Sequence, residues 1–368
     1  MERDSKGTDR ALSYRTLGKT GVKISSLTLG AMNFGARANG DHDDAIRIIH
    51  RALDSGINII DTADSYSQGE SEVIVGKALR NRRDDVIVAT KFHSQWGDGI
   101  NTRGSSRRWI IAEVENSLRR LGTDYIDLYQ QHKPDPDVAL SETIGALDDL
   151  VRQGKIRYYG TTTNEPHLLV EAQWVAERDH RSRPATEQAP YSILARGAER
   201  ATLPIAGKYG LGVLTWSPLA GGWLSGRHIS GVAAPPSARV AQQPARHDPG
   251  LPINQTKREI AIALADLAAD AGLTLPELAV AFVLNHPQVD SVIIGPRTIE
   301  HLESLLGTPQ IVLEASVLDA IDALVPPGVT VNRADEGWQP PWLSTDSDAS
   351  RARRRPVADR LSTAELFG

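Results

Sequence analysis

The chain has 368 residues, with 41 Lys and Arg against 46 Asp and Glu, a net charge of −5 and no cysteine. The lack of cysteine excludes a disulfide framework, a thiolate zinc site, a cysteine nucleophile and a cysteine-bound iron–sulfur cluster. Because no basic stretch dominates and no apolar run reaches the ~18 residues of a membrane span, we expect neither a nucleic-acid nor a membrane partner. The polar first ten residues predict a cytoplasmic protein.

The predicted elements begin after a short N-terminal arm. Residues 1–13 are polar and charged, and we expect this arm to be flexible. Eight β-rich runs follow, and several are nearly continuous apolar runs, which is typical of strands buried on both faces of a parallel sheet. These runs are residues 25–29, 57–61, 86–91, 125–130, 157–162, 185–188, 212–216 and 291–294.

Amphipathic helical patterns lie between most of these runs. In residues 107–121, for example, Ile110, Val114 and Leu118 recur every four positions. Similar patterns cover residues 43–55, 142–153, 257–271 and 274–285. The alternation of eight strands with helices predicts an α/β fold, a (β/α)8 TIM barrel, over residues 14–325. A doubly wound open sheet also alternates, but the count of eight favours a closed barrel.

Two segments do not fit the repeat of strand and helix. Residues 227–255 are rich in Pro, Ala and Arg and too long for a tight connection, so we expect a mobile insertion loop within the barrel domain. Residues 326–368 form a C-terminal segment that we expect to be partly disordered, because its end is charged and rich in turn residues.

Four polar residues lie at or just beyond the ends of three neighbouring predicted strands, where (β/α)8 barrels place their active sites. The second strand ends in Asp61 and the loop beyond it carries Tyr66, the third strand ends in Lys91, and the fourth runs into His132. An ammonium group lowers the pKa of a nearby tyrosine, and a carboxylate keeps that ammonium charged and in place. We therefore expect Tyr66 to exchange a proton with a carbonyl oxygen while Lys91 tunes its pKa. Asp61 would orient Lys91, and His132 would hold the carbonyl.

These four residues also have structural interpretations. An aspartate at a strand end often caps a helix, a single tyrosine often packs as an aromatic, a lysine at a rim is often solvated, and His132 could cap a turn before Lys133-Pro134. Each residue alone favours the structural interpretation, and only their joint position at the strand ends favours catalysis. None of them donates hydride, so the chemistry requires a nicotinamide cofactor and no metal.

Four motifs occur in an order and spacing that are specific to one superfamily. They are Asn58-Ile-Ile-Asp61-Thr-Ala-Asp64-Ser-Tyr66-Ser-Gln-Gly69-Glu-Ser71-Glu72, Ala89-Thr-Lys91-Phe92, Asp124-Tyr-Ile-Asp-Leu-Tyr-Gln-Gln-His132-Lys-Pro134-Asp135 and Trp216-Ser-Pro-Leu-Ala-Gly-Gly222. From about Tyr14 to Leu306 the chain resembles the aldo-keto reductase superfamily. Arg103-Gly104-Ser105 and the residues around Gln188 resemble the branch that contains potassium-channel beta subunits and bacterial relatives.

The resemblance implies a (β/α)8 barrel, NADPH as the reductant and the catalytic set Asp61, Tyr66, Lys91 and His132. It also implies positions around the cofactor. Trp216 corresponds to the aromatic residue on which the nicotinamide stacks, although a buried Trp there could belong to the core. The remaining correspondences are Gln188 for the carboxamide, Ser217, Leu219, Gly222 and Arg227 for the loop that wraps the pyrophosphate, and Gly30 and Met32 for the turn beside the ribose. A core-filling role is the competing interpretation of Met32.

The sequence departs from the superfamily pattern after the fifth strand. Relatives commonly have Gly-x-Ser-Asn there, whereas this chain has Gly160-Thr-Thr162-Thr163-Asn164. Thr162 supplies a hydroxyl in place of the serine, but Thr163 stands at the position of the Asn or Arg. The carboxamide contacts of Thr163 are therefore an open question.

A second departure concerns the adenosine end of the cofactor, at Gly295-Pro-Arg297-Thr-Ile-Glu-His301. Arg297 is placed to pair with a 2′-phosphate, which favours NADPH over NADH. His301 stands where relatives often have Gln or Arg, and Leu305 stands where they often have Asn.

The sequence predicts an NADPH-dependent oxidoreductase that reduces an aldehyde or ketone to an alcohol, with Tyr66 as general acid and a small-molecule carbonyl as substrate. Two alternatives stay open: a keto-deoxysugar nucleotide reductase of a biosynthetic pathway, and a non-catalytic NADPH-sensing binding protein. We expect the loops 93–106, 224–255 and 332–343 to form the pocket wall, where Trp96, Trp223, Trp338 and Trp342 either line the pocket or pack within the loops. The helical patterns are compatible with a homo-oligomer.

Overall fold

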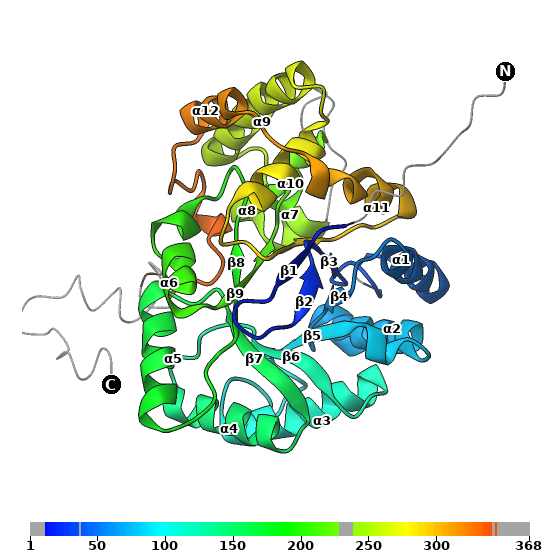
Figure 1. Cartoon of the computed structure of the whole chain (residues 1–368), viewed down its shortest axis with the longest axis vertical. Coiled ribbons are helices and arrows are strands. Elements are labelled where there is room, and N and C mark those ends of the chain that lie inside the picture. The colour runs from blue at the N-terminus through cyan, green and yellow to red at the C-terminus, as the bar shows by residue number, and fades with distance from the viewer. Residues whose placement is uncertain (1–11, 37, 228–237, 341–342, 344–368) are drawn as a thin grey trace, which may run out of the picture.

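The structure is a computed structural model that describes residues 12–36, 38–227, 238–340 and 343. Eight parallel strands close into a barrel, because β10 pairs with β9 on one side and with β3 on the other (Figure 1). In ring order the strands are β3 Leu27–Gly30, β4 Ile59–Asp61, β5 Ile87–Phe92, β6 Ile126–Gln131, β7 Ile156–Thr162, β8 Thr186–Pro190, β9 Gly212–Trp216 and β10 Ser291–Ile294. The predicted (β/α)8 TIM barrel is thereby confirmed.

The interior of the barrel consists of an apolar layer with a polar layer above it. Residues such as Ile59, Ala89 and Leu128 belong to one buried apolar cluster inside the barrel. Because alternate residues of a strand point to the same side, the residues two positions further along face the interior as well. On β4 and β5 these residues are Asp61 and Lys91. The strand register thus brings the candidate catalytic residues to the carboxyl-terminal end of the barrel.

A hairpin that the sequence analysis did not predict covers the opposite end of the barrel. Strands β1 Tyr14–Thr16 and β2 Lys23–Ser25 pair in antiparallel fashion, and Leu17 and Ile24 pack against the apolar interior. The run predicted as one strand over residues 25–29 is therefore divided at Ser26 between β2 and β3. Gly18 is needed at the turn, because a Cβ there would lie 2.4 Å from Gly212 N.

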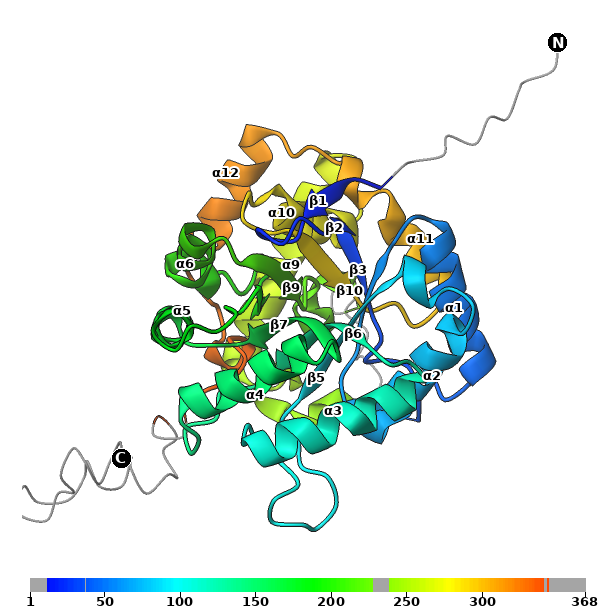
Figure 2. The same ribbon diagram turned by 60° about the horizontal axis from the view of Figure 1, so that its bottom comes forward.

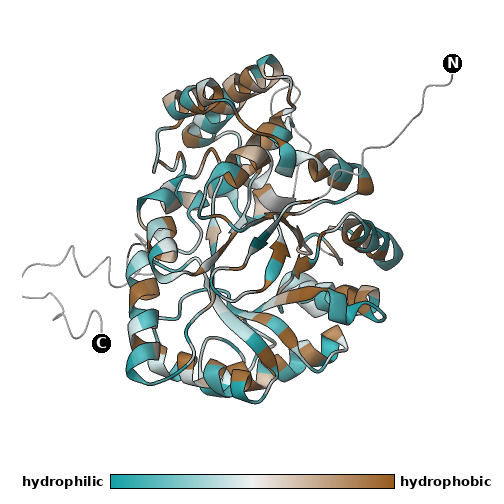
Figure 3. Cartoon of the chain, viewed as in Figure 1, coloured by the Kyte–Doolittle hydropathy of each residue, from teal (hydrophilic) through white to brown (hydrophobic). Residues whose placement is uncertain are grey.

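The helices lie around the barrel (Figure 2), and most of them contribute buried apolar residues to one core cluster (Figure 3). They are α1 His42–Asp54, α2 Glu70–Leu79, α3 Arg107–Leu121, α4 Leu140–Arg152, α5 Pro166–Arg178, α6 Thr202–Tyr209, α7 Ala238–Gln242, α8 Pro244–His247, α9 Pro252–Asp270, α10 Leu275–Asn285, α11 Ile299–Leu306 and α12 Ala315–Leu324. Over the described ranges, no single helix is long and apolar enough to cross a membrane; only a pair bent by 90°, Pro244–Asp270 with Leu275–Asn285, meets the length and composition criteria together.

Much of the predicted insertion loop is folded. Residues 238–255 form α7, α8 and the first turn of α9, and residues 228–237 lie outside the described residues. Arg246 Nε donates to Asp335 Oδ1 at 3.0 Å, and Asn254 Nδ2 donates to the carbonyl oxygen of Asp248 at 2.9 Å. The first contact ties the insertion to the C-terminal segment, and the second holds the insertion together internally, so polar residues that predicted a mobile loop instead stabilise its fold.

The beginning of the C-terminal segment packs on the barrel domain. Arg196 N donates to Val329 O at 3.0 Å, and Val331 N donates to Leu194 O at 3.0 Å, so residues 326–340 continue the fold beyond the predicted boundary at residue 325. The predicted disorder falls mainly on residues 341–342 and 344–368, which lie outside the described residues, as do residues 1–11 of the predicted arm.

Candidate active site

Asp61, Lys91 and Tyr66 are hydrogen-bonded to one another at the carboxyl-terminal end of the barrel. Lys91 Nζ lies 2.6 Å from Asp61 Oδ1 and 3.2 Å from the hydroxyl oxygen of Tyr66, and it donates to Thr62 O at 2.8 Å. Burial acts to lower the pKa of Lys91, but the charges and hydrogen bonds of Asp61 and Tyr66 outweigh burial and raise it. Lys91 is therefore a buried cation held between a carboxylate and a phenol.

The other oxygen of Asp61 is held by two amides. Gln188 Nε2 donates to Asp61 Oδ2 at 2.8 Å, and Gln130 Nε2 donates to the same atom at 3.3 Å. Gln188 was predicted to bind the carboxamide of a cofactor, and in this structure its amide nitrogen supports Asp61. Gln130 was not predicted, although its position two residues before His132 already indicates that it shares the inward face of β6 with the site.

Tyr66 begins the 3₁₀ turn Tyr66–Gly69, in which Ser67 and Gln68 have positive φ angles of 48° and 54°. The turn places the Tyr66 ring edge-on to the ring of His132, with 5.8 Å between the centroids. Burial raises the pKa of Tyr66, and the nearby ammonium of Lys91 opposes this effect without overcoming it. Lys91 was predicted to tune the pKa of Tyr66, and burial has the larger effect on it. The structure instead favours a phenol that keeps its proton, which is the form a proton donor needs.

His132 follows β6 directly and is fixed through its backbone. Its N–H donates to Phe92 O at 3.0 Å, and its carbonyl oxygen accepts a hydrogen bond from Thr162 Oγ1. Burial, with a further contribution from the cation of Lys91, lowers the pKa of His132 well below its ordinary value. Nδ1 of this neutral ring is buried and has no hydrogen-bond partner among the described residues. One ring nitrogen of the imidazole therefore makes no hydrogen bond within the described part of the protein.

The turn after β7 contains further unused polar atoms. Thr163 has a positive φ of 54°, which is rare for a β-branched residue. Thr163 Oγ1 and Asn164 Oδ1 are buried and lack partners within the described part of the chain. Unpaired buried polar atoms are costly unless a ligand or water satisfies them. These two atoms belong to the residues that follow Thr162, whose hydroxyl binds the His132 carbonyl oxygen, and they suit a hydrogen-bonding group such as a carboxamide.

Trp216 ends β9 and is followed by a loop that adopts left-handed backbone angles. Ser217 has a φ of 59°. In the 3₁₀ segment Ala220–Ser225, the φ angle is 70° at Gly221 and 110° at Gly222. A Cβ at Gly222 would meet only Ser225 Oγ, at 3.9 Å, so there is open space beside this backbone. Trp216 is partly buried, whereas Arg227, at the end of the described loop, is exposed. Leu219 lies between them and accepts a hydrogen bond from Gly222 N at 2.9 Å.

The remaining predicted cofactor residues lie where β3 and β10 end. Gly30 is required for packing, because a Cβ there would lie 2.7 Å from Ile293 Cγ2. Met32 is 42% exposed, so its interpretation as a core-filling residue is wrong. Asn33, which the sequence analysis missed, donates from Nδ2 to Gly295 O at 2.8 Å and joins the two strand ends.

Arg297 lies at the N-terminus of α11 and is partly buried. Thr298 caps this helix by accepting a hydrogen bond from the backbone N–H of His301, whose side chain is exposed. A cation beside a helix N-terminus suits a phosphate group. Together with the unused atoms at Thr163 and Asn164 and the open space at Gly222, this arrangement fits a nicotinamide dinucleotide.

The tryptophans that were considered as pocket residues differ in their environments. Trp223 is fully buried, donates from Nε1 to Arg246 O at 3.0 Å and lies 5.1 Å from Lys257 Nζ, so the packing interpretation is correct for it. Trp96 lies against the guanidinium of Arg120, 4.6 Å from its carbon. Trp342 lies outside the described residues.

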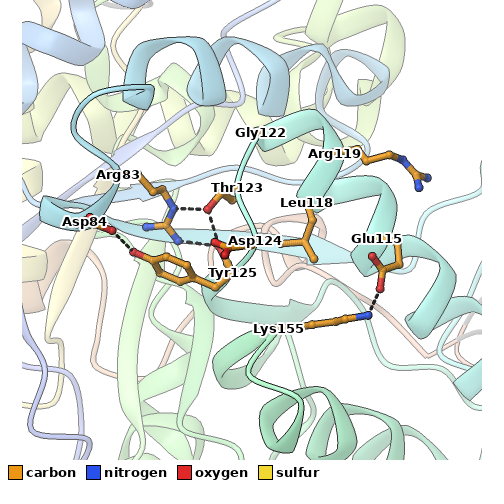
Figure 4. A pocket seen from close by; sticks show the side chains of 10 residues that line it. All are labelled: Arg83, Asp84, Glu115, Leu118, Arg119, Gly122, Thr123, Asp124, Tyr125 and Lys155. Atoms are coloured by element: carbon orange, nitrogen blue, oxygen red, sulfur yellow. Dashed lines mark hydrogen bonds and ion pairs between the residues drawn. The ribbon is translucent and has the colours of Figure 1, made fainter.

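A separate pocket of about 730 Å³ opens at the other end of the barrel, where β5, β6 and β7 begin (Figure 4). Several of its charged side chains are hydrogen-bonded or ion-paired to groups of the protein. Arg83 Nη2 donates to Tyr125 O, the Tyr125 hydroxyl donates to Asp84 Oδ1 at 3.0 Å, and Lys155 pairs with Glu115. Because these groups are satisfied and lie away from Tyr66 and Lys91, we assign the pocket no part in the candidate active site.

The comparisons with known proteins agree with this fold. The family model described as "Aldo/keto reductase family" matches residues 26–326. The chain belongs to this family, and it is an oxidoreductase. Members of the family use nicotinamide cofactors.

Three curated relatives show which branch of the family the chain resembles. It is 38% identical to the uncharacterized oxidoreductase YrpG of Bacillus subtilis, an alignment that covers 86% of this chain and 96% of the relative. It is 34% identical to a probable voltage-gated potassium channel subunit beta of Oryza sativa and 33% identical to one of Arabidopsis thaliana; each alignment covers 85% of this chain and 97% of the relative. These relatives confirm the branch that the sequence motifs indicated.

Proposed function

We propose that the protein is an NADPH-dependent reductase that converts an aldehyde or ketone to an alcohol. The observation that carries this proposal is the Asp61–Lys91–Tyr66 chain, which ends beside the neutral ring of His132. When bound, the nicotinamide cofactor supplies the hydride that adds to the carbonyl carbon. The chain's own residues position the carbonyl and supply the proton.

Tyr66 is the proton donor in this proposal. Its hydroxyl proton moves to the carbonyl oxygen as the C=O double bond becomes a single bond, which leaves an alcohol and a phenolate. Lys91 Nζ, 3.2 Å from the phenolic oxygen, stabilises the negative charge that develops there. Asp61 keeps Lys91 charged and in place. The site therefore needs no metal for proton transfer.

His132 orients the substrate. Because its pKa is lowered well below the ordinary value, its ring stays neutral at physiological pH, and a neutral imidazole donates a single hydrogen bond to the carbonyl oxygen. The unused polar atoms of Thr163 and Asn164, with the amide of Gln188, would hold the carboxamide of the cofactor. Trp216 would stack on the nicotinamide ring. Ser217, Leu219, Gly222 and Arg227 would surround the pyrophosphate.

The test of the proton donor is Tyr66→Phe, which removes only the hydroxyl group. We expect NADPH oxidation with a panel of aldehydes and ketones to fall at least ~100-fold, because general acid catalysis commonly contributes that much. The dissociation constant for NADPH should stay within about twofold of the wild-type value, which shows that the site is intact. Full turnover by the Tyr66→Phe variant would refute the mechanism.

Arg297 supports NADPH over NADH, since it lies at the N-terminus of α11 where a 2′-phosphate would be recognised. Arg297→Ala should weaken the binding of NADPH about tenfold or more and leave the binding of NADH nearly unchanged. Exposed His301 provides a control, because His301→Ala should change the ratio much less. Equal losses for both cofactors in Arg297→Ala would contradict this role.

The relatives named as potassium channel beta subunits raise a second candidate, a protein that binds NADPH without turning it over. The presence of both Tyr66 and His132 favours the enzyme. The carbonyl panel, extended with nucleotide-linked ketosugars, separates these functions: binding of NADPH without turnover of any member supports the binding protein.

A further inference from the structure

Glu187 is a fully buried carboxyl group that the proposed mechanism does not use. It lies on β8 beside Gln188, and because successive side chains of a strand point to opposite faces, it faces away from the catalytic residues toward the outer helices. In the part of the chain that the structure describes, Glu187 has no ion-pair partner. Burying a carboxyl group without a nearby cation costs free energy, so hydrogen bonds must stabilise Glu187 at this position.

Both oxygens of Glu187 bind the turn that follows β7. Thr161 Oγ1 donates to Glu187 Oε2 at 2.5 Å, and Asn164 N donates to Oε1 at 3.0 Å. These two contacts lie on either side of Thr162 and Thr163 in the chain. Glu187 therefore holds the chain on both sides of Thr162 and Thr163. Thr163 and Asn164 carry the unpaired atoms of the candidate cofactor contact.

The segment between these contacts is strained and closely packed. Thr163 has a φ of 54°, a conformation that costs a β-branched residue free energy and persists only when its surroundings enforce it. The Thr163 side chain lies against Gly337, where a Cβ would come within 2.7 Å of Thr163 Cγ2 and 3.3 Å of Trp216 Cζ2. Thr163 and Trp216 thus both pack beside Gly337.

We propose that Glu187 is a positioning residue that clamps the Thr162–Thr163 turn in the form that receives the nicotinamide end of the cofactor. This inference rests on the proposed function of the site. Glu187 touches neither the substrate nor the reacting atoms. It acts through Thr163 and Asn164, so its loss should weaken cofactor binding more than it slows the chemical step.

Glutamine should replace Glu187 with little effect. Burial raises the pKa of Glu187 to about 8, so the group carries a proton at neutral pH. In this protonated form Oε1 still accepts from Asn164 N, while the O–H at Oε2 donates to Thr161 Oγ1 in place of accepting from it. The amide of glutamine, with its oxygen toward Asn164 N and its nitrogen toward Thr161 Oγ1, makes the same two hydrogen bonds. Alanine removes both contacts. The comparison of the two variants separates the clamp from a general need for polarity at this position.

The experiment measures NADPH binding by calorimetry and steady-state kinetics for Glu187→Ala and Glu187→Gln. We expect the alanine variant to raise the dissociation constant and the KM for NADPH about tenfold with kcat within about twofold, and the glutamine variant to stay near wild type. Asp290→Asn is a matched control. Asp290 is a partly buried carboxyl group at the other end of the barrel, and its Oδ2 accepts from two backbone N–H groups, of Gly18 and Val213.

Hydrogen exchange of the Asn164 amide in the cofactor-free protein tests the clamp independently of the proposed function. Exchange should accelerate in Glu187→Ala and not in Glu187→Gln or Asp290→Asn. If wild-type protein fails to bind NADPH, the proposed function fails, while the exchange result still decides whether the clamp exists. Unchanged exchange, or faster exchange with unchanged NADPH affinity, would overturn the inference. If Glu187→Ala does not fold, Thr161→Val replaces it, because valine keeps the shape of threonine and removes only the hydroxyl that contacts Glu187. We expect Thr161→Val to bind NADPH about threefold more weakly than wild type. Unchanged NADPH binding in this variant would contradict the clamp.

Discussion

Lys91→Met tests whether the buried ion pair with Asp61 holds the site together. Methionine fills the volume of the lysine stem but removes the ammonium, so Asp61 stays behind as a buried charge. Breaking one side of a buried pair typically costs ~3–5 kcal/mol of unfolding free energy. The lost donor to Thr62 O adds to this cost, while the amides of Gln188 and Gln130 that still bind Asp61 reduce it. We expect a net loss of about 3–5 kcal/mol.

The double variant Asp61→Asn/Lys91→Met provides the control for this prediction. Because it removes the stranded charge, it should be about 2 kcal/mol more stable than Lys91→Met alone. Urea unfolding followed by far-UV circular dichroism measures both differences. A Lys91→Met protein within about 1 kcal/mol of wild type, or a double variant no more stable than the single one, would show that the pair contributes little and that our account of the site is wrong.

Three further predictions concern other buried groups. Arg120→Leu should destabilise the fold by about 3–5 kcal/mol, because Glu72 and Glu113 each lose their 2.6 Å ion pair in a buried site; a loss below ~1 kcal/mol in urea unfolding would contradict this. Since His132 is neutral in the folded protein, kcat/KM should stay flat from about pH 6 to 7, and a step near pH 6.5 that disappears in His132→Gln would refute this. Burial raises the pKa of Glu187 in the folded protein to about 8, above its ordinary value of 4.5, so its contribution to stability is complete below pH 4.5 and is lost as the pH rises toward 8. The free energy of unfolding of wild type should therefore fall with pH by up to ~5 kcal/mol more than that of Glu187→Gln. The same pH dependence of unfolding in wild type and in Glu187→Gln would contradict this prediction.

The positions of the candidate catalytic residues could be predicted because they depend on strand register. Asp61 and Lys91 are last or nearly last in apolar strands, and the ends of neighbouring parallel strands must meet at one end of a closed barrel. The apolar run of each strand and the polar residue at its end lie within a few residues of one another, so the local sequence was sufficient for this prediction. The hairpin at the other end was missed because β1 and β2 have only three residues each, too few for a recognisable alternation.

Contacts between distant segments could not be predicted in the same way. The four-residue helix α8 has no helical pattern of its own, and Asp335, 89 residues further along the chain, holds it through Arg246. Arg246 appeared in the sequence as one of several charges in a polar loop. Glu187 likewise gave no signal, because its partners become neighbours only when β7 and β8 pair. Side chains whose role is to fix another segment are therefore visible only in the folded structure.

The pKa of Tyr66 shows why the net electrostatics of a site also require the structure. Sequence reasoning identified the correct neighbour, Lys91, and the correct direction of its effect, but burial of the phenol has the larger effect and raises the pKa. The two effects serve the proposed reaction at different stages. Burial keeps the proton on Tyr66 before transfer, and Lys91, at 3.2 Å, stabilises the phenolate that forms afterwards. A reductase needs both, because a tyrosine that ionised too readily would have no proton to give, and one without a nearby cation could not release it.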